Sequence, residues 1–243
     1  MKKIILLLLL GSFALLSTSQ TKDKGAVTNA IPKDTVTIHH LGYKTLYSPT
    51  LDYPLLVEWW DSKSRVSCNQ IDRKDQFAPD PLLEKGSDIQ DEYDAANKQH
   101  KDKGLKGFDR GHMCPAADNQ CPLKVNGKSI TAEKLQTECF YFTNMAPQYH
   151  SLNAGDWKKL EERTRDLAST EDSVHVWCGS VGTQEVIEGL HIPTKCWKVI
   201  YIKKTKTFEY YIFNNTTDKP VGLDAWKVKK EDVEKLTGFK FNP

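Results

Sequence analysis

Three features that would identify common protein classes are missing from this chain of 243 residues. It has no internal repeat and, beyond its first two dozen residues, no apolar run near the roughly 20 residues that a transmembrane helix requires. It also has no Cys-x-x-Cys or His-x-x-x-His pair, the spacings on which structural zinc sites usually draw. These absences argue against a repeat protein, a membrane-embedded protein and a structural zinc site.

A net positive charge is also missing once the first residues are set aside. The full chain has 34 Lys and Arg residues against 32 Asp and Glu residues, and removing Lys2 and Lys3 leaves 32 of each sign. Proteins that bind nucleic acids non-specifically often carry a net basic charge, because neutralising phosphates drives much of the binding. Net charge therefore gives a nucleic-acid function no support, although a local basic groove would be enough for one.

The N-terminus has the pattern of a secretory signal peptide. Lys2 and Lys3 form a basic start, residues 4–16 are almost wholly apolar, and residues 17–19 are small. That combination predicts removal of residues 1–19 and a secreted or periplasmic protein. A membrane anchor is the alternative, but the apolar run is short for a span and no nearby cysteine would carry a lipid. We therefore expect no membrane association after cleavage.

The rest of the chain predicts one domain. About 220 residues remain after cleavage, which is enough for a single domain with a substantial core. Residues 20–36 are polar and mixed, as in a flexible lead-in. Residues 37–243 form the expected domain, and we find no boundary inside it.

All six cysteines lie in the mature part of the chain, where an exported protein meets an oxidising environment. An even count of six predicts up to three disulfides. Cys178 and Cys196 each lie in an apolar, strand-like run, which makes them the expected pair, and the partners of the other four stay open. The six are Cys68, Cys114, Cys121, Cys139, Cys178 and Cys196.

Apolar and β-branched runs bounded by turn residues predict a mixed α+β domain with a central, mainly antiparallel sheet. Residues 229–236 are the expected short C-terminal helix, since acidic residues begin it and a lysine lies near its end. Residues 69–107 and an apparent insertion at 119–138 are expected to be loops. The expected strands are residues 39–47, 55–60, 108–112, 139–143, 174–178, 196–203 and 208–214.

A helix is predicted from Asn153 onward, because apolar residues then recur at intervals of three and four, as on one face of a helix. That face consists of Trp157, Leu160, Thr164 and Leu167. The solvent side is expected to carry Lys158, Lys159, Glu162, Arg163 and Arg165. Strand 108–112, strand 139–143 and this helix together make a ββα unit.

Residues 108–115, Phe-Asp-Arg-Gly-His-Met-Cys-Pro, place a histidine beside an arginine in a tight turn. His112, with an unperturbed pKa of about 6.5, suits a base that activates water for attack on phosphorus. Arg110 offers a rigid fork of donors for phosphate oxygens. The alternatives are a structural histidine and an arginine in a salt bridge to Asp109 or a nearby acid. Asp109 itself is expected to be a structural acceptor that pins the turn.

Asn153 and Glu161 supply hard oxygen atoms for a metal ion. Mg²⁺ keeps most of its waters and takes few protein ligands, so one amide oxygen supported by one carboxylate is sufficient. Positions 153, 157 and 161 are spaced by four and run along one side of the helix, with Trp157 packing beneath the site. The alternative role for Asn153 is a helix N-cap. Glu162 is the neighbouring carboxylate that lies off this face.

The order of these residues resembles the DNA/RNA non-specific endonuclease family of the ββα-metal superfamily. In that family an Asp-Arg-Gly-His segment precedes an Asn…Pro-Gln…Leu-Asn…Trp…Leu-Glu segment; here the two lie at residues 109–112 and 144–161. Upstream, Arg73, Phe77 and Asp80 resemble the family segment whose arginine approaches the phosphate. The resemblance also implies that Asn144 lies in the active site, in a role that chemistry alone leaves open.

The resemblance implies a Mg²⁺-dependent endonuclease, with Mn²⁺ as a substitute, that cleaves DNA and RNA with little sequence preference and leaves 5′-phosphate ends. His112 would deprotonate the attacking water, and Mg²⁺ on Asn153 would stabilise the developing charge. Arg110, with Arg73 assisting, would bind the phosphate. The expected site residues are His112, Arg110, Arg73, Asn144 and Glu161, with Asn153 as the metal ligand.

Two other classes of function stay open. One is an inactive nucleic-acid-binding module, against which the intact His112, Asn153 and Glu161 argue. The other is a thiol hydrolase, since Cys114 and His112 are two residues apart and would share one face of a strand, and a histidine can activate a thiol. The biological target, an inhibitor partner, and the oligomeric state are also left open.

Overall fold

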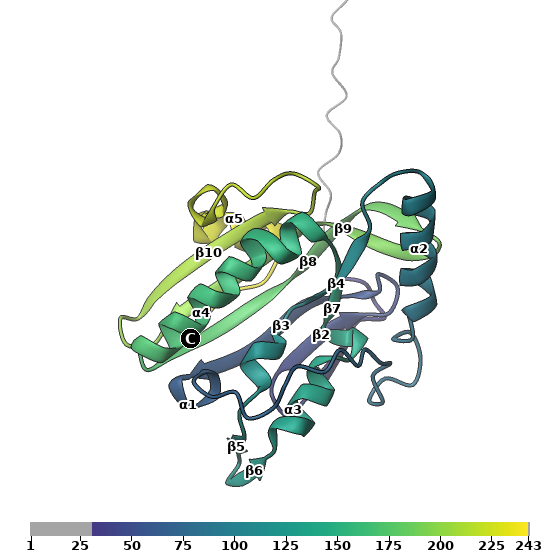
Figure 1. The fold of residues 1–243 in the computed structure, drawn as a ribbon. Coiled ribbons are helices and arrows are strands. Elements are labelled where there is room, and N and C mark those ends of the chain that lie inside the picture. The colour runs from purple at the N-terminus through teal and green to yellow at the C-terminus, as the bar shows by residue number, and fades with distance from the viewer. Residues whose placement is uncertain (1–30, 243) are drawn as a thin grey trace, which may run out of the picture.

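The computed structural model describes residues 31–242, which form an α+β fold around a six-stranded sheet (Figure 1). Every neighbouring pair in the order β1-β2-β3-β8-β9-β10 is antiparallel, which confirms the predicted fold class. The predicted signal peptide at 1–19 and lead-in residues 20–30 lie outside the described residues. The strands are β1 (Val36–His39), β2 (Lys44–Ser48), β3 (Tyr53–Ser62), β8 (Ser173–Ile187), β9 (Leu190–Ile202) and β10 (Thr207–Asn214).

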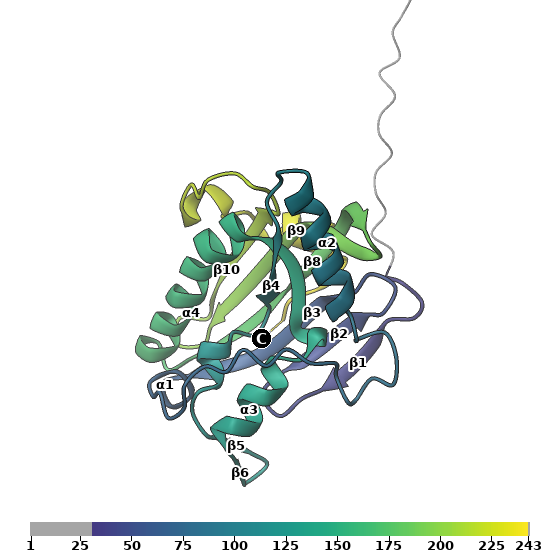
Figure 2. The same cartoon turned by 45° about the vertical axis from the view of Figure 1, so that its right-hand side comes forward.

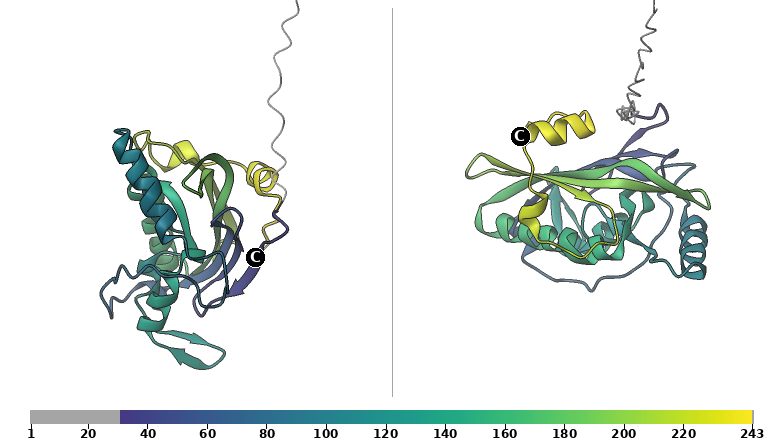
Figure 3. Two further views of the ribbon diagram at one scale, coloured as in Figure 1. Left: turned by 90° about the vertical axis from the view of Figure 1, so that its right-hand side faces the viewer. Right: turned by 90° about the horizontal axis from the view of Figure 1, so that it is seen from above.

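Apolar side chains pack on both faces of the sheet, because side chains alternate along its strands. In β8, Val174 and Val176 pack on one face and Trp177 on the other. Helix α4 (Lys158–Thr170) covers the first face and α5 (Lys230–Thr237) the second. Seen from above in Figure 3, the two helices lie on opposite sides of the sheet.

A two-stranded ribbon lies on the α4 side of the sheet (Figure 2). It consists of β4 (Phe108–His112) and β7 (Met145–Tyr149). After β7 the chain forms η3 (Leu152–Trp157), a kinked helical stretch that continues directly into α4. The remaining elements are α1 (Lys63–Val66), α2 (Gln90–Asp102), η1 (Ala116–Asn119), β5 (Leu123–Val125), β6 (Lys128–Ile130), α3 (Ala132–Cys139), η2 (Phe142–Asn144) and η4 (Leu223–Trp226).

The strand predicted at residues 139–143 is wrong. Cys139 ends α3, a 3₁₀ turn follows in η2, and the strand that pairs with β4 is β7. Phe140 and Phe142 are both buried, and their rings pack against Phe77. The aromatic run therefore reflects burial around the site and not strand pairing.

Two segments predicted as loops contain regular structure. Residues 69–107 include α2, whose buried positions are only Tyr93, Ala96 and His100, too few to produce a clear apolar period. Residues 119–138 contain the β5–β6 hairpin and α3, and the hairpin turn is Asn126-Gly127 with positive φ at both residues, the conformation that a tight hairpin requires. None of the helices in residues 31–242 is long and apolar enough to cross a bilayer.

The predicted disulfide between Cys178 and Cys196 is also wrong. Strands β8 and β9 pair so that Cys178 lies opposite Lys198 and Cys196 lies opposite Ser180. The two cysteines are thus diagonal neighbours, and such positions are roughly 7–8 Å apart across a sheet, which is too far for a disulfide. Both are free and buried.

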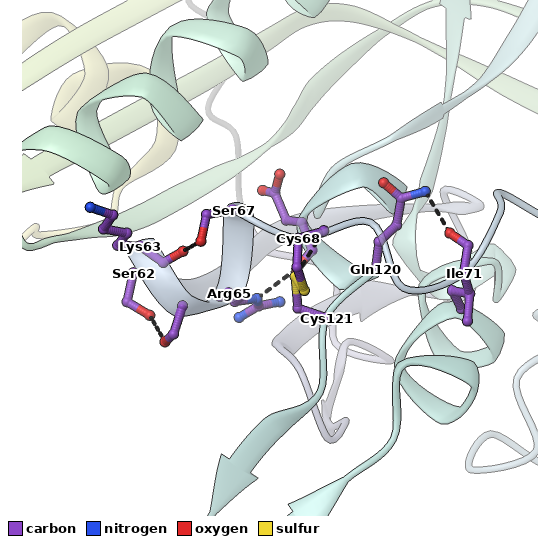
Figure 4. Close-up of a disulfide and its surroundings, with 10 residues drawn as sticks. Ser62, Lys63, Arg65, Ser67, Cys68, Ile71, Gln120 and Cys121 are labelled. Carbon is purple, nitrogen blue, oxygen red and sulfur yellow. Dashed lines mark hydrogen bonds between the residues drawn. A yellow bond between two sulfur atoms is a disulfide. The ribbon is translucent and has the colours of Figure 1, made fainter.

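One disulfide is present among the described residues, between Cys68 and Cys121 (Figure 4). It joins the chain just after α1 to the chain just after η1. Beside it, the side-chain amide of Gln120 donates to the carbonyl oxygen of Ile71 at 3.1 Å. The disulfide closes a covalent ring that contains α2 and β4.

Candidate active site

The ββα unit is present, with β7 in place of the predicted second strand. Strands β4 and β7 pair from Phe108 opposite Tyr149 to His112 opposite Met145. Close packing explains the glycine before the histidine. A Cβ atom on Gly111 would lie 2.2 Å from Oε1 of the buried Gln148, so this position in β4 has no room for a larger residue.

His112 ends β4 with a free ring nitrogen. Its imidazole lies between Phe77 and Phe140, with centroids 5.8 and 4.7 Å away, and the residue is 7% exposed. Within residues 31–242, Nε2 has no hydrogen-bond partner. Burial, aided by the positive charge of Arg73, lowers the pKa of His112 to about 3. The imidazole is therefore neutral and able to accept a proton.

Arg110 is held against two aromatic rings. Its guanidinium carbon lies 5.3 Å from the ring centroid of Phe77 and 5.1 Å from that of Tyr93. One terminal nitrogen pairs with Asp94 at 3.0 Å, so the acid partner is not Asp109. The Nε–H has no partner in the part of the chain that the structure describes. Arg110 thus keeps unused donors in a fixed orientation.

Asn153 has its amide group oriented by a carboxylate. Its Nδ2 donates to Oδ2 of Asp109 at 2.8 Å, and the same oxygen lies 2.8 Å from Nδ1 of His150. Asp109 is thus a structural acceptor, as predicted, but its partners lie in the chain after β7 and it does not pin a turn of its own segment. A carboxylate only accepts, so the amide nitrogen faces it and Oδ1 points elsewhere. No residue of 31–242 donates a hydrogen bond to that oxygen, and Asn153 lies inside η3 and not at a cap.

Glu161 is a carboxylate with an elevated pKa. Burial raises its pKa to about 7, the negative charge of Asp118 acts in the same direction, and Lys198 and Arg165 oppose them. Lys198 is itself fully buried beneath the site, with its Nζ 4.1 Å from the ring centroid of Trp157. The raised pKa of Glu161 thus results mainly from burial, which the two nearby cations offset only in part.

Five of the six predicted site residues line one cleft of about 280 Å³. Arg73 reaches it from the segment before α2, lies over the ring of Phe140 at 5.4 Å and is 53% exposed. The lining of the cleft has four cationic side chains and one carboxylate. It is therefore a local basic groove in a protein without a net positive charge. Its lining consists of Arg73, Arg110, His112, Pro115, Ala116, Ala117, Asn153, Ala154, Lys158, Glu161 and Arg165.

Two of these cations were assigned to the solvent side in the sequence analysis. Lys158 and Arg165 both line the cleft, and Arg165 is anchored by a 3.1 Å ion pair with the buried Asp118. The spacing in the sequence indicated the position of Arg165, because Arg165 follows Glu161 by four residues and so lies on the same helical face. Their charge suggested solvent, but a substrate cleft is also open to solvent.

Asn144 does not line the cleft. It is fully buried, and its side chain binds backbone only. Its Oδ1 accepts from the amide of Cys114 at 2.9 Å, and its Nδ2 donates to the carbonyl oxygens of Cys114 and Cys139 at 2.9 and 2.8 Å. The structure therefore makes Asn144 a clamp that holds the chain after His112.

Cys114 is buried below the turn and does not belong to the cleft lining. Burial raises the pKa of its thiol to about 12, although the charge of Arg65 acts in the opposite direction. The thiol contacts the side-chain nitrogens of Arg65 and Asn119 at 3.7 and 3.4 Å. A protonated thiol at this depth does not fit the nucleophile of a thiol hydrolase.

A neutral histidine, an amide oxygen and a carboxylate among arginines, carried on a ββα unit, are the parts of a metal-assisted phosphodiester hydrolase of the ββα-metal class. Within that class, comparison with protein families identifies this chain. It belongs to the DNA/RNA non-specific endonuclease family, whose model matches residues 20–243.

Individual relatives agree with the family. The chain is 27% identical over 225 residues to the mitochondrial nuclease EXOG of Xenopus laevis, covering 84% of this chain and 57% of that protein. It is 29% identical over 145 residues to a nuclease of Serratia marcescens, covering 54% and 49%. The chain thus spans about half the length of the curated relatives it matches.

A solved structure shares the fold. The chain of the EndoG/EndoGI complex, described as showing the mechanism of EndoG inhibition, matches with a TM-score of 0.63 and 24% identity over 84% of each chain.

Proposed function

We propose that this chain is a divalent-metal-dependent endonuclease that hydrolyses the phosphodiester bonds of DNA and RNA, with Mg²⁺ as its ion and Mn²⁺ as a substitute. The observation that carries the proposal is one cleft that holds a neutral histidine with a free nitrogen, an unused amide oxygen, and a carboxylate beside four cations. Phosphodiester hydrolysis needs a proton acceptor, an oxygen ligand for a metal and cations for the phosphate.

Asn153 and Glu161 would hold the ion. Two observations support the fit. The Oδ1 atom of Asn153 is turned away from Asp109 and receives no hydrogen bond from residues 31–242, and the carboxylate of Glu161 lies in the same cleft. Few protein oxygens are typical of Mg²⁺ sites. When bound, the ion would supply Lewis-acid stabilisation of negative charge on the phosphate oxygens.

His112 would accept the proton of the water that attacks phosphorus. The low pKa of the free protein makes His112 a weak base on its own. A phosphate bound beside it would raise that pKa, because a nearby negative charge favours the imidazolium form. The base would thus gain strength only when substrate occupies the cleft, which keeps it neutral and ready beforehand.

Arg110 and Arg73 would bind the non-bridging phosphate oxygens, with Lys158 and Arg165 completing the basic lining. Guanidinium groups bind such oxygens with two parallel hydrogen bonds. The lining offers cations to the backbone of a nucleic acid, and phosphate contacts carry no sequence information. This composition supports cleavage with little sequence preference.

We also infer that the protein is exported, as a secreted or periplasmic enzyme. The basis is the signal-peptide pattern of residues 1–19, and a disulfide between Cys68 and Cys121 fits an oxidising compartment. Mass spectrometry of exported protein should give a mature chain that begins near Gln20. An intact segment 1–19 in that protein would refute the assignment.

Incubation of the purified mature protein with plasmid and with RNA, with and without chelator, tests the function. We expect cleavage of both that chelation abolishes and Mg²⁺ or Mn²⁺ restores. Absence of cleavage with bound nucleic acid would leave the inactive binding module. Cleavage that survives chelation but is lost in Cys114→Ser and after alkylation would establish the thiol hydrolase instead.

A further inference from the structure

The segment that carries Asn153 does not hold its shape through regular helical hydrogen bonds alone. In η3 two helical stretches meet at a kink. Within it, Gly155 has φ −98° and ψ −116°, outside the helical region. A kink of this kind between β7 and α4 needs support from another part of the chain.

That support comes from residues 216–226, which we call the C-terminal strap. The carboxylate of Asp156 is 2% exposed, and its Oδ2 accepts three hydrogen bonds from the strap. The donors are the backbone amides of Val221 and Gly222 at 2.8 and 3.1 Å and the indole nitrogen of Trp226 at 2.9 Å. Its other oxygen, Oδ1, accepts a hydrogen bond from Nζ of Lys159 at 2.9 Å.

The strap also holds η3 at two other points. The hydroxyl of Ser151 donates to the carbonyl oxygen of Thr216 at 2.7 Å. Pro220 packs so closely over Gly155 that a Cβ atom there would lie 2.6 Å from its Cγ. These contacts lie on both sides of Asn153 in the sequence. The strap therefore grips the kinked segment before and after the residue that it presents to the cleft.

The strap is attached to the framework of the fold. At its start the fully buried Asn215 donates to the carbonyl oxygens of Pro147 and Pro193, each at 2.9 Å, and accepts from the amide of Tyr149 at 3.0 Å. After its end, the amide of Val228 donates to the carbonyl oxygen of Tyr210 on β10 at 2.9 Å. The contacts of Asp156 thus connect η3 to β7, β9 and β10.

We propose that Asp156 is a positioning residue, through which the C-terminal strap fixes η3 so that Asn153 is aimed at the divalent-cation site. The inference rests on the proposed function. Asp156 does not line the cleft and would touch neither ion nor phosphate. It acts through the backbone, while Asp109 fixes the rotation of the Asn153 amide.

The charge of Asp156 fits this role. Burial would raise its pKa, but the hydrogen bonds from Lys159, Trp226 and the strap amides lower it to about 2. The carboxylate is therefore ionised at any pH at which a nuclease works, and hydrogen bonds to a charged acceptor are stronger than neutral ones. This role differs from that of a helix cap. A cap would bind only backbone amides in the first turn of α4, whereas the donors to Oδ2 of Asp156 lie 65 to 70 positions further along the chain.

The test is binding of Mn²⁺ alone to the full mature chain, measured by electron paramagnetic resonance without nucleic acid. Asp156→Ala should weaken Mn²⁺ binding by ~10-fold or more, the usual effect of removing a residue that supports a metal ligand. Trp226→Phe keeps the ring packing and deletes one donor, so it should weaken binding less but in the same direction. Excess Mn²⁺ should restore cleavage in both variants.

Two variants serve as matched controls. Lys159→Ala removes the partner on the other oxygen of Asp156 and leaves the strap contacts intact, and Asp218→Ala changes an exposed strap residue that bonds only within the strap. Both should bind Mn²⁺ as the wild type does. Circular dichroism checks that each variant is folded, and Trp226→Phe keeps the question answerable if Asp156→Ala does not fold.

Hydrogen exchange of the amides of residues 152–157 in metal-free protein gives a second readout. It should accelerate in Asp156→Ala and in Trp226→Phe but not in the two controls. Folded Asp156→Ala with wild-type Mn²⁺ affinity would overturn the positioning role. A wild type that binds no Mn²⁺ would instead refute the proposed metal site, while faster exchange in the variants would still establish the hold of the strap on η3.

Discussion

The two halves of the cleft are prepared in different ways. The half on β4 holds its groups against aromatic rings: Arg110 lies on Phe77 and Tyr93, and His112 lies between Phe77 and Phe140. The half on η3 and α4 holds its groups through polar contacts: Asp109 orients the amide of Asn153, and Lys198 and Arg165 lie near Glu161, whose pKa burial raises to about 7. The first half is thus arranged by aromatic packing and the second by hydrogen bonds and charges.

The difference extends to protonation. The pKa of His112 is lowered to about 3 and arginines stay charged in proteins, so neither His112 nor Arg110 changes charge between pH 4 and pH 9. Glu161 changes charge near neutrality. The pH dependence of the free protein should therefore come from the half that would hold the metal, which is the reverse of what a histidine at its ordinary pKa suggests.

The largest effect on cleavage is expected from a substitution in the β4 half of the cleft. His112→Ala should lower the cleavage rate by ~10²–10⁴-fold, the usual contribution of general-base catalysis, and should leave Mn²⁺ binding unchanged. Cleavage kinetics on one plasmid, with Mn²⁺ titration and circular dichroism on the same preparation, measure both. A folded His112→Ala protein with full activity would refute the role of His112, and one that no longer binds Mn²⁺ would refute the separation of the two halves.

Asn153→Ala breaks the other half. It removes the proposed direct ligand, so the Mn²⁺ dissociation constant should rise by ~100-fold or more, at the upper end of the effect of removing a residue that only supports a metal ligand, with a matching loss of cleavage. Its matched control is His150→Ala, which removes the other partner of Asp109 and leaves the amide oxygen in place. If Asn153→Ala cleaves normally and only loses stability, Asn153 has a structural role and the ion lies elsewhere.

Glu161→Gln sharpens the comparison, because activity and stability should move in opposite directions. Cleavage should fall by ~10–100-fold. The folded-state pKa of about 7 lies above the ordinary 4.5, so the stability that Glu161 contributes is present below pH 4.5 and is lost as pH rises through 7. At pH 8 the metal-free variant should therefore be more stable than the wild type, by on the order of 2 kcal/mol.

Thermal unfolding at pH 5 and pH 8, with chelator, checks this. The stabilisation should be present at pH 8 and largely absent at pH 5. The Mn²⁺ affinity of the wild type should also weaken as pH falls below 7, because protons then compete for the carboxylate, and Glu161→Gln should lose that dependence. Equal pH dependence in both proteins would show that another group governs metal binding.

The smallest expected effects come from two arginine-to-lysine substitutions, of which Arg110→Lys should have the larger effect. The charge stays, but the flat group that lies on Phe77 and Tyr93 and its fork of donors are lost. Cleavage should fall by roughly 10-fold, the value of about 1.4 kcal/mol of lost transition-state stabilisation, with Mn²⁺ binding unchanged. The exposed Arg73 offers the matched substitution, and Arg73→Lys should have a smaller effect. An equal loss in both would mean that aromatic packing does not orient Arg110.

Much of the site was predictable because its chemistry depends on residue type and short spacing. His112, Arg110, Asn153 and Glu161 lie within two short segments, and the structure brings them to one cleft. The role of Asn144 was not predictable, because an amide that binds backbone and one that binds a ligand look the same in a sequence. Arg165 was missed because charge was taken as a sign of solvent.

The fold was predictable where burial and strand formation coincide, as in β8, β9 and β10. The fold was not predictable at residues 139–143. There Phe140 and Phe142 are buried around the site in a turn, but aromatic residues are also typical of strands. The Cys178–Cys196 pair failed because the register of two strands, which places Cys178 opposite Lys198, is set by their turn and cannot be read from either run.

The disulfide between Cys68 and Cys121 divides the molecule in a way that the cleft does not. The covalent ring that it closes spans 53 positions and contains Arg73, Arg110 and His112, while Asn153 and Glu161 lie outside it. A ring of this size removes conformational entropy from the unfolded chain equivalent to about 4 kcal/mol. That free energy is independent of any ion, so a protein stripped of metal keeps it and a reduced protein loses it. Oxidation therefore stabilises the folded segment that contains β4, because it lowers the conformational entropy of the unfolded chain.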